Sequence, residues 1–144
     1  MKSSLIAKKS KVASGGSRKG KLTTSQLIAS IKSGLPYREL EDLRVSLDLP
    51  IENLAPLLGM SKATLHRRKI SGKLESAESD RIVRYSRLFD TAASVMESKE
   101  AGRLWLKSPQ VGLGGAIPLG YAETEVGARE VEDLLGRIEF GVYS

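Results

Sequence analysis

The fold is decided by the stretch Leu49–Arg68, which reads LPIENLAPLLGMSKATLHRR. It predicts two short helices joined by a tight turn. Pro50 suits the first position of a helix, where its missing N–H costs nothing. Gly59 can take the left-handed conformation that ends the first helix, and Ser61 can cap a second helix beginning at Lys62. The first helix has an apolar stripe at helical spacing: Leu54, Ala55, Leu57 and Leu58. This is the layout of a helix-turn-helix, whose second helix enters the major groove of DNA.

The second helix of this stretch has a polar and basic surface. No acid occurs between residues 55 and 73, whereas five Lys or Arg do. We predict that six side chains contact DNA: Ser61, Lys62, Thr64, His66, Arg67 and Arg68. Arg67 or Arg68 can make a bidentate contact to guanine, while Ser61 and Lys62 suit phosphates. Two packed helices with a basic solvated face would show the same pattern. Pro56 predicts a kink or a late start of the first helix.

The composition limits the class of protein. A chain of 144 residues forms one domain or two small ones. Because there is no cysteine, disulfides, zinc–thiolate sites and cysteine nucleophiles are excluded, which fits a reducing compartment. No apolar run approaches the ~20 residues of a membrane span, and the basic N-terminus lacks the apolar core of a signal peptide. We therefore expect a soluble, cytoplasmic protein.

The charge is unevenly distributed along the chain. The net charge is +6, but residues 1–21 alone contain seven Lys or Arg and no acid. We predict that this segment is a disordered basic tail, which either adds phosphate contacts or is a solvated leader without a role. Residues 121–144 contain six acids against two arginines. This polarity predicts different partners for the two ends of the chain.

Apolar residues at helical spacing predict an all-α fold. Besides the helix pair, helices are expected at about residues 24–32, 36–47, 76–97, 98–106 and 124–140. Their expected apolar faces are Leu27, Ile28 and Ile31; Leu40, Leu43 and Leu47; Ile82, Tyr85, Phe89, Ala92, Ala93 and Met96; Ala101, Leu104 and Trp105; and Val126, Val131, Leu134, Leu135 and Ile138. Ser98 and Thr124 can cap the last two helices. We interpret Arg81, Arg84 and Arg87 as a solvated face with local ion pairs.

The loop at residues 109–120, PQVGLGGAIPLG, is dense in glycine and proline. One interpretation is architectural: the loop connects two helices and lets Trp105 and Ile117 pack against the last helix. The other is that the loop and the last helix form a platform for another protein. Tyr143 favours the second interpretation, because an aromatic residue beyond a helix end has little reason to be there unless it docks.

Signatures of catalysis are sparse. His66 is the only histidine, so neither a serine triad nor a two-histidine metal site can be built without using it twice. The glycines at 112–115 are not followed by Gly-Lys-Ser/Thr, and no strand precedes them, so neither a P-loop nor a dinucleotide fingerprint fits. We expect no enzyme, no metal and no cofactor.

Several segments taken in order resemble a known family. They are SKATLHRR (61–68), ESDRIVRYSRL (78–88), AGRLWLKSP (101–109) and LGGAIPLGYAETEVGAREVEDLLGRIEFGVYS (113–144). The most specific elements are Trp105-Leu106 to Pro109, Leu113-Gly114-Gly115, Pro118, Thr124-Glu125-x-Gly127 and Arg137-Ile138-Glu139-x-Gly141. With this order and spacing, residues 35–144 resemble the Xre/MbcA/ParS family of type II antitoxins.

The resemblance implies an Xre-like helix-turn-helix followed by a toxin-binding domain, and a protein that represses its own operon. The partner it implies is a RES-domain toxin that depletes NAD⁺ and whose cleft is covered by the C-terminal domain and tail. The toxin-binding residues would be Trp105, Gly114, Gly115, Pro118, Arg137, Glu139, Tyr143 and Ser144. An acidic last helix is complementary to a cationic nucleotide cleft, and we expect Glu139, Tyr143 and the Ser144 carboxylate to reach it.

The expected organisation is a tail at 1–21, a DNA-binding domain at 22–75, a connecting helix at 76–97 and a toxin-binding domain at 98–144. One recognition helix supplies few contacts, so we expect a homodimer or an equivalent bridged by the toxin. Two alternatives remain open. One is a one-component transcription regulator with a C-terminal dimerisation or ligand domain, and the other is a partitioning or adaptor protein with the same fold.

Overall fold

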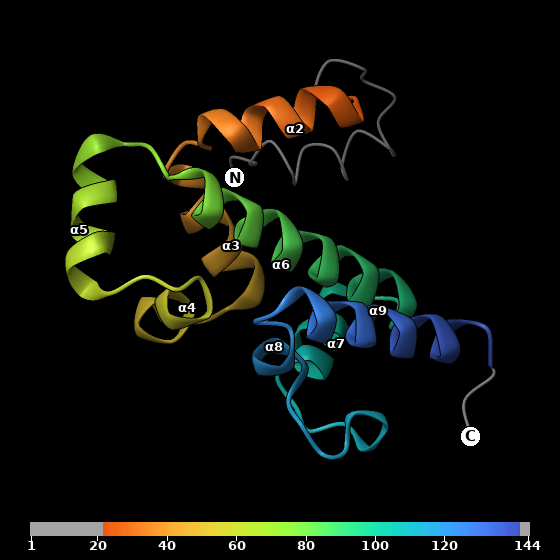
Figure 1. The fold of residues 1–144 in the computed structure, drawn as a ribbon. Coiled ribbons are helices and arrows are strands. Elements are labelled where there is room, and N and C mark those ends of the chain that lie inside the picture. Colours follow the sequence, from red (N-terminus) through yellow and green to blue (C-terminus); the bar gives the residue numbers. More distant parts are fainter. Residues whose placement is uncertain (1–21, 142–144) are drawn as a thin grey trace. The chain divides into compact units, whose positions relative to one another are not determined.

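Helices and turns build residues 22–141, the part of the chain that the computed structural model describes (Figure 1). The elements are α2 (Thr24–Ser33), α3 (Arg38–Leu47), α4 (Ile51–Leu57), α5 (Lys62–Ser71), α6 (Ser76–Val95), α7 (Lys99–Leu106), the 3₁₀ helix η2 (Val111–Leu113), α8 (Pro118–Tyr121) and α9 (Glu125–Glu139). No strand occurs in this part of the chain, and Pro36 and Lys73 form an isolated bridge. The predicted all-α class is confirmed. The predictions for residues 1–21, Tyr143 and Ser144 lie outside the described residues.

The chain divides into two compact units between Ser86 and Arg87, so α6 contributes to both. Each unit has its own apolar core. In unit 1 the buried residues are Leu35, Leu40, Leu43, Leu47, Leu54, Ala55, Leu58, Met60, Leu74, Ile82, Val83 and Tyr85. In unit 2 they are Leu88, Phe89, Ala92, Leu106, Leu113, Leu119, Ala122, Ala128, Val131, Leu134 and Leu135. Apolar residues of successive helices therefore supply the core within each unit.

Helix α2 begins where the sequence predicts but is poorly buried. Thr23 accepts a hydrogen bond from the N–H of Gln26, whose side chain in turn accepts one from the N–H of Thr23. This capping box sets the start of the helix. No residue of α2 is buried, and Ile28 is 49% exposed. The apolar face predicted for α2 thus lies at the surface of unit 1, whereas that of α3 is buried as expected.

The arginines of α6 differ from the solvated face that the sequence suggests. The Arg84 side chain is only 11% exposed, and its guanidinium lies 3.9 Å from the carboxylate of Asp80. Arg81 is also half-buried and donates a hydrogen bond to the carbonyl of Leu58. The expected local ion pair is present at Arg84 and Asp80, whereas the expected exposure is found at Arg87, with 51% of its side chain exposed. An arginine can bury its methylene stem against apolar neighbours while its charged end finds a partner.

Unit 2 confirms the predicted caps but corrects two apolar faces. Ser98 and Thr124 accept hydrogen bonds from backbone N–H groups and open α7 and α9. However, Leu104 is 66% exposed and Val126 is 76% exposed, so neither points into the core. Ile117 is 45% exposed, so it is not a buried residue of the core, and its packing against the last helix stays a prediction.

The reason for the turned face of α7 is a glycine. A Cβ on Gly102 would lie 2.6 Å from the backbone nitrogen of Ala93, so α7 meets α6 through the backbone of Gly102. Leu106 is buried and shares that side of the helix with Gly102, whereas Leu104 is turned away from it. The same holds for α9, where a Cβ on Gly127 would overlap the carbonyl of Tyr121. Glycines at close contacts thus displace the apolar faces inferred from large side chains.

No helix within residues 22–141 is both long enough and apolar enough to cross a bilayer.

Candidate functional site

The turn between α4 and α5 is closed by backbone hydrogen bonds around Gly59. Gly59 has φ +72°, as its position in the sequence predicts. Its N–H donates to the carbonyl of Pro56 at 3.0 Å, and the N–H of Met60 donates to that of Ala55 at 2.9 Å. This pair of bonds is a Schellman motif, which satisfies the last carbonyls of a helix. The Arg81 guanidinium adds a third bond, 3.2 Å from the Leu58 carbonyl, so α6 fixes the turn from outside.

The two prolines of α4 sit at its ends. Pro50, predicted to be the first residue of the helix, is instead its N-cap, with ψ 152°. The helix therefore begins one residue later, at Ile51. Pro56 is the last residue but one of a seven-residue helix. A proline lacks the N–H that would bond to the carbonyl of Glu52, so the helix is one bond weaker at this point. The Schellman turn follows, and the helix ends at Leu57, one residue after Pro56.

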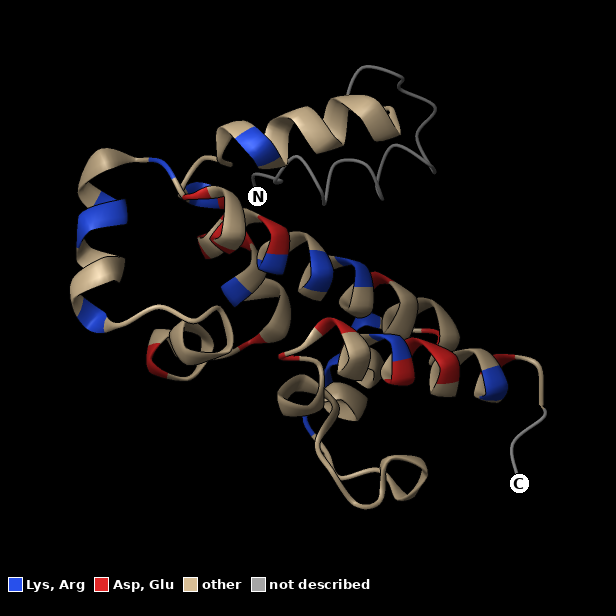
Figure 2. Cartoon of the chain, viewed as in Figure 1, with Lys and Arg blue, Asp and Glu red and all other residues tan. Residues whose placement is uncertain are grey.

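The start of α5 is organised by three polar side chains. Ser61 accepts a hydrogen bond from the N–H of Thr64 at 3.1 Å and caps the helix, as predicted. The hydroxyl of Thr64 in turn lies 3.3 Å from the donor nitrogen of Arg67. The structure therefore brings together three of the residues predicted to contact DNA. Of the six residues predicted to contact DNA, four are exposed and two, Thr64 and Arg68, are half-buried. The exposed ones are Ser61, Lys62, His66 and Arg67. Lys and Arg are the only charged residues of α5 (Figure 2).

Arg68 differs from the other five predicted residues because its side chain is bonded to another helix, α6. It donates two hydrogen bonds to the carboxylate of Glu78, at 2.8 and 3.0 Å. The Arg68 side chain is 17% exposed and that of Glu78 10%. A bidentate pair of this geometry fixes both partners. The prediction that Arg68 contacts DNA stays a prediction; its guanidinium is bonded to Glu78 of α6, whereas Arg67 is exposed.

Glu78 is the main residue that sequence reasoning missed. Besides Arg68, it accepts a hydrogen bond from the N–H of Glu75 at 2.8 Å, so it also caps the start of α6. Burial by itself raises the pKa of its carboxyl group, but the hydrogen bonds from Arg68 and from the Glu75 backbone outweigh burial, and the pKa lies below its usual value. The signal in the sequence was the Glu-x-x-Glu at 75–78, which places Glu78 at the third position after the residue that precedes the helix.

The residues predicted to bind a toxin lie in different environments in unit 2. Pro118 is buried and opens α8, whereas Trp105 is half-buried on α7. Gly114 and Gly115 are exposed, with φ +68° and +89°, and a Cβ on either would meet no other atom. Their need for glycine is therefore conformational. Arg137 and Glu139 are exposed on the last turn of α9.

Helix α9 presents an exposed stripe on the side opposite its core. The stripe repeats at i, i+4, i+7, i+11 and i+14, which is one face of a helix. It consists of Val126, Glu130, Asp133, Arg137 and Phe140. Its two apolar ends are 76% and 78% exposed. Acids outnumber bases on α9 as a whole (Figure 2). An acidic stripe with an exposed apolar group at each end is a surface suited to a protein partner.

Comparisons with known proteins match both units. Residues 26–87 match the antitoxin Xre-like helix-turn-helix domain, and residues 91–141 match the antitoxin Xre/MbcA/ParS C-terminal toxin-binding domain. A protein named Antitoxin Xre from Yersinia enterocolitica serotype O:8 / biotype 1B is 33% identical over 120 residues, which cover 82% of this chain and 81% of that protein. Another Antitoxin Xre, from Photorhabdus laumondii subsp. laumondii, is 32% identical over the same shares of both chains.

Proposed function

Because the chain belongs to the Xre family of antitoxins, we propose that it is the antitoxin of a type II toxin–antitoxin pair that also represses its own operon. What supports the proposal most is that two antitoxin domains follow one another in one chain and fall on the two compact units. It acts in the cytoplasm as a binding protein, not as an enzyme.

Unit 1 binds operator DNA through α5. The exposed side of α5 carries Lys62, His66 and Arg67 without an acid, and a helix of this kind fits the major groove. Arg67 reads a guanine, while Ser61 and Lys62 contact phosphates. Since one helix contacts only a half-site, the chain binds as a homodimer or as a complex that pairs two copies.

Unit 2 binds the toxin, a RES-domain enzyme that degrades NAD⁺. The exposed stripe of α9 makes the first contact, because its acids are complementary to a cleft that holds a pyrophosphate. Phe140 at the end of the stripe is 78% exposed, and an aromatic group in this position is suited to anchor an interface. The last residues, with Glu139 leading into Tyr143 and Ser144, then cover the active site.

The experiment is co-expression of the chain with the toxin gene beside it, with growth as the readout. Full-length chain restores growth, and deletion of residues 141–144 abolishes the rescue. Glu130→Lys and Asp133→Lys each weaken it, because they put a positive charge against a cationic cleft. Glu97→Lys is the matched control: it makes the same change at an exposed residue of unit 2 outside the stripe. Equal rescue by all three charge variants would reject α9 as the contact surface.

A further inference from the structure

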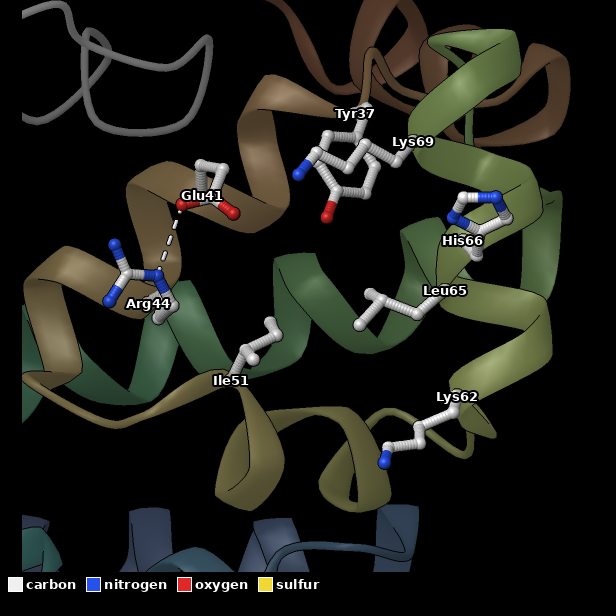
Figure 3. Close-up of a pocket in the computed structure, with 8 residues that line it drawn as sticks. All are labelled: Tyr37, Glu41, Arg44, Ile51, Lys62, Leu65, His66 and Lys69. Atoms are coloured by element: carbon white, nitrogen blue, oxygen red, sulfur yellow. Dashed lines mark hydrogen bonds and ion pairs between the residues drawn. The ribbon is translucent and has the colours of Figure 1, made fainter.

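A groove of about 380 Å³ lies beside the recognition helix in unit 1. Figure 3 shows side chains of α3 on one side of it and side chains of α5 on the other. The lining residues are Tyr37, Glu41, Arg44, Ile51, Lys62, Leu65, His66 and Lys69. Lys62 and His66 are among the residues predicted to contact DNA, whereas the sequence predicted no DNA contact for the lining residues outside α5.

The charge of the groove is positive. Lys62, His66 and Lys69 recur at i, i+4 and i+7 along one flank of α5, all exposed. None of the three makes an ion pair with any residue between 22 and 141. The one acid of the lining, Glu41, already accepts a hydrogen bond from Arg44 at 3.0 Å. The groove thus holds two lysines without counter-ions, which favours the binding of an anion.

The position of this flank on α5 indicates where the anion comes from. With about 100° per residue, α5 has three sectors. Leu65 and Arg68 face the rest of unit 1. Ala63, Arg67 and Ile70 face away from it. Lys62 and Lys69 lie between these sectors, on the groove side. When a helix lies in the major groove, its outward sector meets base edges and its flanks meet the sugar–phosphate strands.

Across the groove from α5, the hydroxyl of Tyr37 supplies an uncharged hydrogen-bond donor (Figure 3). The Tyr37 side chain faces the groove, and its hydroxyl makes no hydrogen bond to any described residue. Burial, with a contribution from Glu41, raises the pKa of this hydroxyl, so it keeps its proton and can donate. Ile51 and Leu65 supply the apolar part of the lining, which suits the sugar ring of a nucleotide.

We propose that this groove binds one phosphate of the DNA backbone, held by Lys69 and Tyr37 with Lys62 at the rim, so that the N-cap of α3 belongs to the DNA interface. The proposal rests on the proposed function of unit 1 as a DNA-binding module. It assigns Lys69 and Tyr37 to positioning the chain on the duplex rather than to reading its sequence.

The test measures affinity for the promoter DNA of the chain's own gene, and for an unrelated duplex, by fluorescence anisotropy across a series of salt concentrations. Lys69→Ala should weaken both complexes several-fold and lower the salt slope by about one phosphate equivalent, ~0.9. Tyr37→Phe should weaken both to a smaller extent. Lys32→Ala, an exposed lysine of α2 outside the groove, is the matched control and should leave the slope unchanged. An unchanged slope for Lys69→Ala overturns the proposal.

A second arm locates the phosphate. Each backbone phosphate of the promoter site is replaced in turn by a neutral methylphosphonate. At one position, the methylphosphonate should weaken binding of the unsubstituted protein by as much as Lys69→Ala weakens binding to unmodified DNA. At that position, combining the methylphosphonate with Lys69→Ala should weaken binding no more than either change alone. Additive losses at every position overturn the assignment.

A third arm separates the two sources of phosphate. Titration with inorganic phosphate alone, followed by NMR, should give no saturable binding, whereas sub-millimolar binding would assign the groove to a free anion and overturn the backbone source. The outcomes also separate this proposal from the function of unit 1. A chain that binds its own promoter no better than unrelated DNA contradicts autorepression, while the salt slopes still decide the groove.

Discussion

The ion pair between Arg68 and Glu78 holds the recognition helix in place, and Glu78→Gln tests this. No residue of α5 is fully buried, so α5 depends on the half-buried Leu65 and on this pair. The substitution keeps the shape of Glu78 but turns an NH₂ group toward the guanidinium and removes the charge. A hydrogen bond to a charged group contributes about 1.5–3 kcal/mol. Because the two side chains keep 17% and 10% exposure, water replaces part of the loss, and we expect a cost of about 1–2 kcal/mol.

The measurement separates the two units. Far-UV circular dichroism in urea follows both, whereas the fluorescence of Trp105, the single tryptophan, follows unit 2. Glu78→Gln should destabilise only unit 1, so the circular dichroism transition shifts while the Trp105 fluorescence transition does not. In thermal unfolding, the melting temperature of unit 1 should fall by roughly 4–8 °C for each kcal/mol lost. Affinity for promoter DNA should fall by a few-fold to about tenfold, since ~1.4 kcal/mol corresponds to a factor of ten.

Glu75→Gln is the matched control. Glu75 also lies near Arg68, at 3.5 Å, but its side chain is 67% exposed. Exposed pairs contribute about 0–1 kcal/mol, so this variant should resemble the unsubstituted protein. Equal effects of Glu75→Gln and Glu78→Gln would refute the assignment of the bidentate pair as the anchor of α5.

The pH dependence gives an independent check on Glu78. Because its pKa is lower in the folded protein than in the unfolded chain, its contribution is present above the unfolded carboxyl pKa of about 4.3 and is lost as the pH falls through the folded pKa. The stability difference between the unsubstituted protein and Glu78→Gln should therefore be full at neutral pH and shrink in acid. A difference that stays constant into acid would contradict the lowered pKa.

Three further substitutions have defined outcomes. Gly102→Ala should cost unit 2 about 1–3 kcal/mol by overpacking, seen as an earlier Trp105 fluorescence transition in urea, and no change there would contradict the close contact of α7 with α6. Ile70, which is 73% exposed on the outward sector of α5, should contact a thymine methyl. Uracil at that position should weaken binding by about 0.8 kcal/mol for the protein with Ile70 and not for Ile70→Ala; equal losses would reject the contact. Arg87→Gln should cost less than about 1 kcal/mol in thermal unfolding, since the pair with Glu132 is largely exposed, and a larger loss would mean that the pair matters for folding.

The positions of the helices follow from local chemistry that the sequence displays. Ser61, Ser98 and Thr124 mark three helix starts, because a side-chain oxygen that satisfies a free N–H is encoded within three residues. Gly59 marks the turn in the same way. The four-residue helix α8 could not be foreseen, since it is too short to show a period.

The environment of single residues depends on contacts that no periodicity encodes. Leu104 and Val126 are apolar and correctly spaced, yet they are exposed because glycines make the close contacts of α7 and α9. Arg68 and Glu78 are ten residues apart and pair only because a loop returns α6 beside α5. The same limit applies to the groove, whose walls come from α3, α4 and α5.

The most direct test of the account is to purify the full-length chain with the protein encoded by the neighbouring gene and to measure NAD⁺ hydrolysis. We predict a stable complex without activity, in which Asp133→Lys restores hydrolysis and leaves promoter binding intact, while Arg67→Ala does the reverse. A chain that neither binds this protein nor suppresses its activity would contradict the assignment of unit 2 as the toxin-neutralising module.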